Sequence, residues 1–139
     1  MFKKILVPLD GSKLAEGIVP RVEWLAKIHD AEVTLIRVAL AHSFPGTDPV
    51  QHQVNVVREA EEYLARVENN LRSVGVKVNS VVRYGHDAQE IVDHAKDRDI
   101  DLIAMSTHGR TGLGQFVLGS VANKIIHTAT VPILLCRVC

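Results

Sequence analysis

The chain alternates short apolar runs with longer segments in which apolar residues recur every third or fourth position. Nearly unbroken apolar runs occupy Ile5–Leu9, Val33–Leu40 and Leu102–Met105. Runs of this kind are typical of strands that are buried on both faces of a parallel sheet. Val76–Gly85 and Val131–Cys136 also contain β-branched residues at strand-like density, so the pattern predicts five strands.

The segments between these strands carry helical patterns. The apolar residues of Ala15–Ala26 define one face of a first helix, and a second helix from about Val50 carries an apolar stripe that ends near Gly75. A short third helix follows, with Asp87 as its expected N-cap. A fourth helix is expected to open at Gly119-Ser120.

Five strands that alternate with four helices predict a three-layer α/β sandwich around a parallel sheet. We expect the strand order 3-2-1-4-5, a flavodoxin-like arrangement, in one domain over residues 1–139. In such open sheets a ligand binds beyond the carboxyl ends of the strands, where the strand order reverses. That point falls between the first and fourth strands and directs attention to the loops after Leu9 and Met105.

The composition limits the partners of such a domain. The 139 residues include 16 Lys+Arg and 16 Asp+Glu, so the formal net charge is +0, and only 4% are aromatic. A neutral chain lacks the attraction that binds nucleic acid or anionic membranes, and a single-stranded nucleic acid would need aromatic stacking platforms. No apolar run approaches the ~20 residues of a membrane span, and Asp10-Gly11 ends the first run too early for a signal peptide. We therefore expect a cytoplasmic protein.

The loop after the fourth strand has chemistry that suits a polyphosphate. Ser106–Ser120 is rich in glycine, which permits positive φ angles and close approach to a ligand, and Gly119-Ser120 opens a helix whose free N–H groups favour phosphate. Two common nucleotide motifs do not fit. Gly114–Ser120 has Ser in place of the P-loop lysine, and Gly112-x-Gly114 lacks the third glycine of the dinucleotide fingerprint.

A different spacing, Gly109 followed after nine residues by Gly119-Ser120, resembles the nucleotide-binding signature of the universal stress protein family. The resemblance covers nearly the whole chain. It is carried by these blocks, in the order found in the family: Lys4–Ser12, Asp101–Met105, Thr107–Gly112, Gly119–Ala122 and Val131–Leu134.

The resemblance implies an adenine nucleotide alpha hydrolase-like fold that binds ATP, with Mg²⁺ or Mn²⁺ held through the phosphates. Pro8, Leu9 and Asp10 would border the adenosine, with Asp10 at the ribose. Val38 would present its backbone to the adenine edge, and Met105 would pack against the nucleoside. The positions that would hold or border the phosphates are Ser106, His108, Gly109, Arg110, Gly119, Ser120 and Val121.

One position departs from the family pattern. The signature usually begins Gly-x-x-Gly, whereas this chain has Ser106 in the first position. Serine is small and can donate a hydrogen bond, so we expect nucleotide binding to survive, unless the position requires a positive φ angle.

Several of these residues also have a plainer interpretation. Asp10 could cap a turn, Arg110 could be a solvated cation, and His108 is expected to orient the loop. Thr111 and Ser120 are candidate donors to phosphate or to metal-bound water, with helix capping as the alternative for Ser120. Four titratable residues near the Asp87 helix have a spacing that a metal could use, but we interpret them as an exposed helix face: His86, Glu90, Asp93 and His94.

Two other uncommon residue types receive structural interpretations. Cys136 and Cys139 have C-x-x-C spacing, but they follow an apolar strand and do not begin a helix, so we interpret them as one buried and one terminal thiol. Trp24, the one tryptophan of the sequence, is expected to pack at the edge of the first helix.

No nucleophile beside a general base and no carboxylate cluster for two metals can be identified, which argues against an efficient hydrolase or kinase. We therefore predict an ATP-binding protein of stress response or signalling, whose nucleotide-dependent shape alters its protein partners. The Phe44–Pro49 loop could cover the nucleotide, and the apolar edge strand Val131–Val138 is expected to pair with a second copy. A slow ATPase or other nucleotide hydrolase on the same fold and a nucleotide-free dimeric interaction module are the alternatives.

Overall fold

The computed structural model describes residues 1–40, 46, 48–108 and 119–138. In these ranges, parallel strands form a five-stranded sheet in the order β3-β2-β1-β4-β5. The predicted α/β class, the strand order and the flavodoxin-like arrangement are therefore confirmed. The strands are β1 (Lys4–Pro8), β2 (Glu32–Leu40), β3 (Lys77–Gly85), β4 (Leu102–His108) and β5 (Ile133–Val138).

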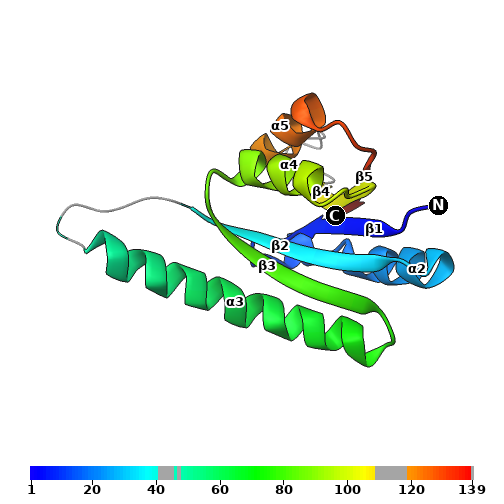
Figure 1. Ribbon diagram of the computed structural model, residues 1–139, viewed down its shortest axis with the longest axis horizontal. Coiled ribbons are helices and arrows are strands. Elements are labelled where there is room, and N and C mark those ends of the chain that lie inside the picture. Colours follow the sequence, from blue (N-terminus) through cyan, green and yellow to red (C-terminus); the bar gives the residue numbers. More distant parts are fainter. Residues whose placement is uncertain (41–45, 47, 109–118, 139) are drawn as a thin grey trace.

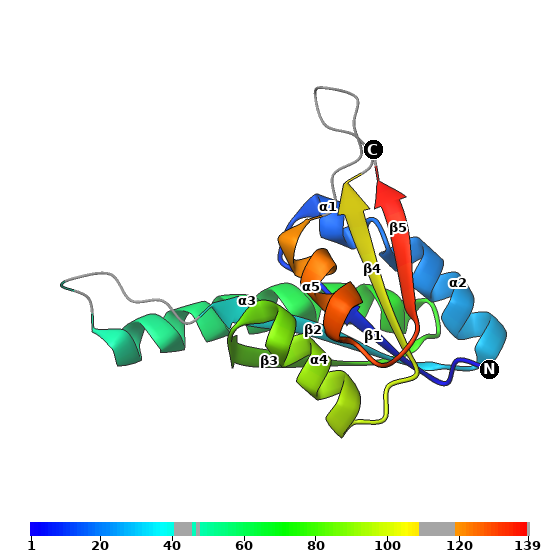
Figure 2. The ribbon, with the colours of Figure 1, turned by 90° about the horizontal axis from the view of Figure 1, so that it is seen from above.

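Helices cover both faces of the sheet and complete the three layers (Figure 1). One face carries α1 (Lys13–Glu16), α2 (Val19–His29) and α3 (Pro49–Ser73). The opposite face carries α4 (Asp87–Asp97) and α5 (Ser120–Thr128). Viewed from above, α3 extends well beyond the end of the sheet, in the direction of the carboxyl ends of β2 and β3 (Figure 2).

The alternation of side chains along β1 explains why its apolar run is unbroken. Ile5 and Val7 belong to the core beneath α2 and α3, whereas Leu6 belongs to the core beneath α4 and α5. All three side chains are fully buried. Because successive residues of a strand face opposite sides, a central strand with a helical layer on each side needs apolar residues at every position.

The first predicted helix is divided in two. It breaks at Gly17-Ile18, so α1 ends at Glu16 and α2 begins at Val19. Pro20 explains the break, because proline has no N–H to donate and its ring clashes with the carbonyl four residues earlier, here that of Glu16. The division leaves α1 as a single short turn beside the end of β1.

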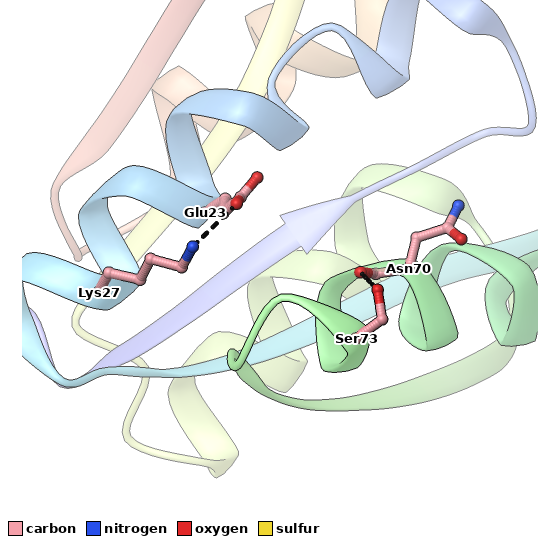
Figure 3. A network of polar contacts seen from close by, with 4 residues as sticks. All are labelled: Glu23, Lys27, Asn70 and Ser73. Atoms are coloured by element: carbon pink, nitrogen blue, oxygen red, sulfur yellow. Dashed lines mark hydrogen bonds and ion pairs between the residues drawn. The ribbon is translucent and has the colours of Figure 1, made fainter.

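Local polar contacts define the ends of the longer helices. The Asp48 carboxylate accepts a hydrogen bond from the Val50 N–H at 3.0 Å and caps α3. At the other end the Ser73 hydroxyl donates to the Asn70 carbonyl oxygen at 2.7 Å, and Gly75 ends the helical path with a φ angle of 90° (Figure 3). Figure 3 also shows the ion pair between Lys27 and Glu23 in α2, at 3.0 Å.

Three expectations at the level of single residues were wrong. The capping position of α4 is His86 and not Asp87, whose Oδ1 accepts instead from the neighbouring Ala88 N–H at 2.8 Å. Trp24 is 63% exposed, because it lies two residues from the buried Val22 and so on the opposite side of α2. Strand β5 begins at Ile133, later than the predicted Val131.

The interpretation of the C-terminal cysteines is confirmed for one of the two. Cys136 in β5 is buried and unpaired, whereas Cys139 lies outside the described residues. A search of the described helices finds none with the length and apolar character of a membrane span.

Candidate functional site

A cavity of about 490 Å³ lies where β1, β2 and β4 end and where α5 begins. Because β1 and β4 are the neighbours at which the strand order reverses, this is the place where open α/β sheets bind their ligands. A volume of this size is ordinary for a small-molecule site. Helices α1 and α3 contribute lining residues from one helical layer and α4 from the other.

The cavity brings together predicted site residues from both ends of the chain. Nine of the twelve line it: Pro8, Leu9, Asp10, Val38, Met105, Ser106, Gly119, Ser120 and Val121. The side chain of His108 lies outside the described residues, and so do Gly109, Arg110 and Thr111. Much of the predicted covering loop, including Phe44 and Pro45, lies outside them as well, so the roles expected of these residues stay predictions.

Asp10 lies directly after β1 and uses one carboxylate oxygen for the local turn. Its Oδ1 accepts hydrogen bonds from the N–H of Ser12 at 2.8 Å and from the Ser12 hydroxyl at 2.5 Å. Ser12 in turn caps α1 by accepting from the Ala15 N–H at 3.1 Å. The turn-capping role of Asp10 is therefore present. It fixes an exposed carboxylate beside the cavity, and Oδ2 makes no hydrogen bond to the described part of the chain.

Ser106 is accommodated in β4 without strain. It pairs with Cys136 of β5, and its φ angle is not positive. Its hydroxyl donates to the Ala15 carbonyl oxygen at 3.2 Å. The first position of the signature therefore does not require glycine in this chain, and serine links β4 to α1 there.

Thr107, the next residue of β4, has a hydroxyl that no other described group satisfies. The residue is 4% exposed and lines the cavity, and its Oγ1 has no hydrogen-bond partner in the described ranges. Buried hydroxyls without a partner are uncommon in folded proteins. The Thr107 hydroxyl is therefore a candidate donor to a bound ligand.

The amino end of α5 opens on the cavity. Gly119 is the N-cap residue, and no side chain of the described residues caps the first N–H groups of this helix. Those groups lack intrahelical partners, and together with the helix dipole they favour an anion. The φ angle of Gly119 is −65°, so positive φ is not what glycine supplies at this position. A Cβ at this position would meet no described atom within 4 Å, so a side chain there would project into open space beside the helix end.

The described lining of the cavity is not basic. It holds three carboxylates, those of Asp10, Glu59 and Asp87, and one guanidinium, that of Arg37. Arg37 Nη2 lies 3.9 Å from Glu59 Oε1, but the Glu59 side chain is 74% exposed, so the pair is weak. Side-chain charge in this part of the cavity therefore does not attract an anion, and the amino end of α5 is the main feature that does.

Helix α3 supplies cavity residues that the sequence reasoning missed. His52, Val56 and Glu59 line the cavity and share one side of the helix at spacings of four and three. The same row continues to Tyr63, which is buried. The Arg37 guanidinium lies over its ring, with Cζ 5.1 Å from the ring centroid. Burial, and then the nearby Glu16 carboxylate, raise the pKa of Tyr63, so its phenol stays protonated at neutral pH.

Metal-binding side chains do not gather in the described ranges, where no group of three or more His, Cys, Asp or Glu could hold an ion. We expected the four titratable residues near α4 to form one exposed face, and this expectation was wrong. His94 is 4% exposed, because it lies three positions after the buried Ile91 and so on the same side of the helix.

Comparison with known proteins assigns the family. Residues 1–137 match the sequence profile of the universal stress protein family. The chain belongs to that family. This universal stress protein is 34% identical to the universal stress protein MJ0531 of Methanocaldococcus jannaschii, over 99% of this chain and 83% of that protein.

Solved structures share its fold. MJ0577 of the same archaeon superimposes with a TM-score of 0.88 at 30% identity, over 100% of this chain and 98% of that one. A universal stress protein of Archaeoglobus fulgidus, solved in complex with dAMP, superimposes with a TM-score of 0.72 at 20% identity, over 96% and 97% of the two chains.

Proposed function

We propose that this universal stress protein binds an adenine nucleotide, with ATP as the ligand, in the cavity at the ends of β1, β2 and β4. The observation that carries the proposal is that one cavity joins an aliphatic pocket to the uncapped amino end of α5. The first feature suits a nucleoside and the second suits its phosphates. The dAMP complex of the Archaeoglobus fulgidus relative supports an adenine nucleotide as ligand on this fold.

The nucleoside part would lie among aliphatic side chains. Ile36, Val38, Met105 and Leu9 line the cavity, and none of its described lining residues is Phe, Tyr or Trp. Adenine would therefore be held by apolar contacts and by backbone hydrogen bonds, for which Val38 at the open end of β2 is the candidate. The Oδ2 atom of Asp10 would accept from a ribose hydroxyl, since Oδ1 is already used by Ser12.

The phosphates would lie at α5, away from the carboxylates. Backbone N–H groups that follow Gly119 would hold them, with the Ser120 hydroxyl and Thr107 Oγ1 as additional donors. Gly109 and Arg110 are expected to complete this site from the segment that follows β4. Because Asp10, Glu59 and Asp87 would repel phosphate, we expect the phosphates to lie nearer to the amino end of α5 than to these carboxylates.

A divalent ion would be carried by the nucleotide. In the described ranges no cluster of carboxylate or imidazole groups could form its coordination shell. Mg²⁺ commonly keeps several water ligands and takes the remaining oxygens from substrate phosphates. The described donors therefore support Mg²⁺ or Mn²⁺ held through the phosphates, with Ser120 as a donor to its water shell.

The biological role proposed here is in stress response or signalling in the cytoplasm, through a nucleotide-dependent conformation that alters binding to a protein partner. The formal net charge of +0 argues against nucleic acid as that partner. Strand β5 is an edge of the sheet and carries Ile133, Leu134 and Leu135, which are partly buried. An apolar edge favours pairing with a second copy, so we propose a homodimer.

Mass spectrometry of the ligand released from freshly purified protein tests the proposal before any assay is chosen. We expect an adenine nucleotide, with ATP predominant. If no nucleotide is released and none binds at millimolar concentration, the protein is a nucleotide-free interaction module and the proposal fails. Rapid turnover of added ATP that is lost in Asp10→Asn or Gly119→Val would instead identify an enzyme.

A further inference from the structure

A second cavity lies beneath the carboxyl-terminal half of α4 and shares no lining residue with the first. Its volume is about 560 Å³. The sheet forms one side of it, with residues of β2 and β3 that include Thr34 and Asn79. His94 of α4, and Arg98 directly after that helix, form another side. We call this cavity the α4 groove.

The α4 groove is lined by an excess of positive charge. Lys4, Arg83 and Arg98 face one carboxylate, that of Glu32. The Glu32 Oε1 atom is occupied by the Asn79 side-chain amide, which donates to it at 2.9 Å. Neither arginine takes part in an ion pair within the described part of the chain. Three cations and one carboxylate leave an excess of two positive charges, which an anion of charge near −2 would balance.

Arg83 is held in place by a neutral partner. Its Nη2 lies 3.1 Å from His94 Nδ1, and His94 is 4% exposed. Burial, and then the charges of Arg83 and Arg98, lower the pKa of His94, while the weaker influence of Asp97 acts in the opposite direction. A neutral imidazole accepts from the guanidinium through Nδ1 and carries its own proton on Nε2. The guanidinium is therefore oriented without its charge being neutralised.

Arg83 also keeps an unused donor. Its Nε is buried and has no hydrogen-bond partner in the described ranges. Buried donors are nearly always satisfied, by protein or by a bound species. The planar guanidinium presents its N–H groups in a fork that matches two oxygens of a phosphate.

We propose that the α4 groove is a second ligand site, for the phosphate group of a small molecule or for free phosphate. Arg83 and Arg98 are its cationic ligands, with Lys4 as a third charge at its edge. A phosphate monoester carries between −1.5 and −2 charges at neutral pH, which matches the excess charge of the groove, whereas a single carboxylate would balance only half of it. The site is independent of the proposed nucleotide site, because the two cavities have no lining residue in common.

The test is a titration of the intact protein with inorganic phosphate, followed through the imidazole nitrogen resonances of His94. Equal ionic strength of chloride is the reference. We expect a saturable change at His94 and a rise in its pKa, since a bound anion offsets the repulsion by the two arginines. Arg83→Gln or Arg98→Gln should weaken binding about tenfold or more, the usual loss for a charge-assisted hydrogen bond. Arg83→Lys keeps the charge but not the forked N–H groups, so its phosphate affinity should lie between those of the parent protein and Arg83→Gln.

Two further variants separate this site from other effects. Lys124→Gln removes one exposed positive charge on α5, and phosphate affinity should be unchanged. Gly119→Val alters the nucleotide cavity, and the response of His94 should remain. The proposal is overturned if chloride reproduces the change at His94, or if Gly119→Val abolishes that change while Arg83→Gln does not. Titration with glycerol 3-phosphate then assigns the source: tighter binding than phosphate indicates a phosphorylated metabolite, and equal or weaker binding indicates the free ion.

Discussion

The Ser106 hydroxyl donates a hydrogen bond to the carbonyl oxygen of Ala15, at 3.2 Å, and so links the end of β4 to α1. Both residues line the cavity that we propose for the nucleotide. The glycine that the sequence resemblance leads us to expect at the Ser106 position has no side chain to form this bond. In this chain the serine therefore stabilises the wall of the cavity, and it does so with ordinary backbone angles.

Replacement of Ser106 by alanine tests this role. The variant leaves the partly buried Ala15 carbonyl without its donor, so the free energy of unfolding should fall by about 0.5–1.5 kcal/mol in urea denaturation. Ser73→Ala is the matched control, because its hydroxyl also donates to a carbonyl but lies at an exposed helix end, and it should cost less. Equal losses in the two variants would remove the special role of Ser106.

Thr107 offers a test in which stability and binding should move in opposite directions. Thr107→Val removes a buried hydroxyl that has no partner in the described ranges, so the ligand-free protein should keep its stability or gain about 1 kcal/mol. The same change should weaken ATP binding, because the proposed donor to the ligand is lost. Thr107→Ser retains the hydroxyl and should retain the affinity. A Thr107→Val variant with unchanged ATP affinity would show that the ligand does not use this hydroxyl.

The sequence predicted the sheet well because its strands lie in a central, doubly covered layer. The unbroken run at Ile5–Leu9 follows directly from burial on both faces of β1. The cap at Asp48, by contrast, depends on local chemistry that the sequence contains but that we did not use. The division between α1 and α2 was missed because the apolar period continues across Pro20, and the missing N–H of proline has a larger effect than the periodicity.

The candidate site was predictable to the extent that it lies at strand ends. The reversal of strand order fixes the positions of Leu9 and Met105 whatever the side-chain details. The contribution of α3 depends on the rotation of a long helix about its axis, so the row formed by His52, Val56 and Glu59 could be recognised only in three dimensions. The burial of His94 could have been predicted, because its spacing of three residues from the apolar Ile91 places both on one side of α4.

The burial of His94 leads us to predict that the protein loses stability in acid. Its pKa is lowered in the folded protein from the ordinary value of 6.5, so below that pH the unfolded chain binds the proton more readily than the folded one. The contribution of His94 to the free energy of unfolding is therefore fully present above pH 6.5. It falls as the pH decreases toward the pKa of the folded state, by at most about 1.4 kcal/mol per pH unit.

Urea denaturation across this pH range, with His94→Gln, measures the effect. The variant should show a shallower dependence of the free energy of unfolding on pH below 6.5 than the parent protein. His127→Gln, at an exposed position in the last turn of α5, is the matched control. Identical pH dependence in the parent and in His94→Gln would contradict the assignment of the acid sensitivity to this buried histidine.

From the position of β5 at the sheet edge we predict that two copies of the chain associate. Its half-buried apolar residues lie at an edge of the sheet, where a second copy could add a strand. Sedimentation equilibrium at micromolar concentration should give twice the mass of the chain. A monomer at that concentration would contradict the proposed homodimer. It would not bear on the proposal that the chain binds a nucleotide.

The central claim is that ATP binds in the cavity at α5, and calorimetric titration of the purified, ligand-free protein with ATP tests it most directly. The parent should bind one ATP per chain. Gly119→Val should fold normally, because its φ angle suits any residue and a Cβ there meets no described atom within 4 Å. It should nevertheless lose ATP binding, since the side chain occupies the entrance to the helix, and Gly119→Ala should be intermediate. Full ATP affinity in a folded Gly119→Val variant would contradict the placement of the phosphates, and no binding by the parent would contradict the proposal itself.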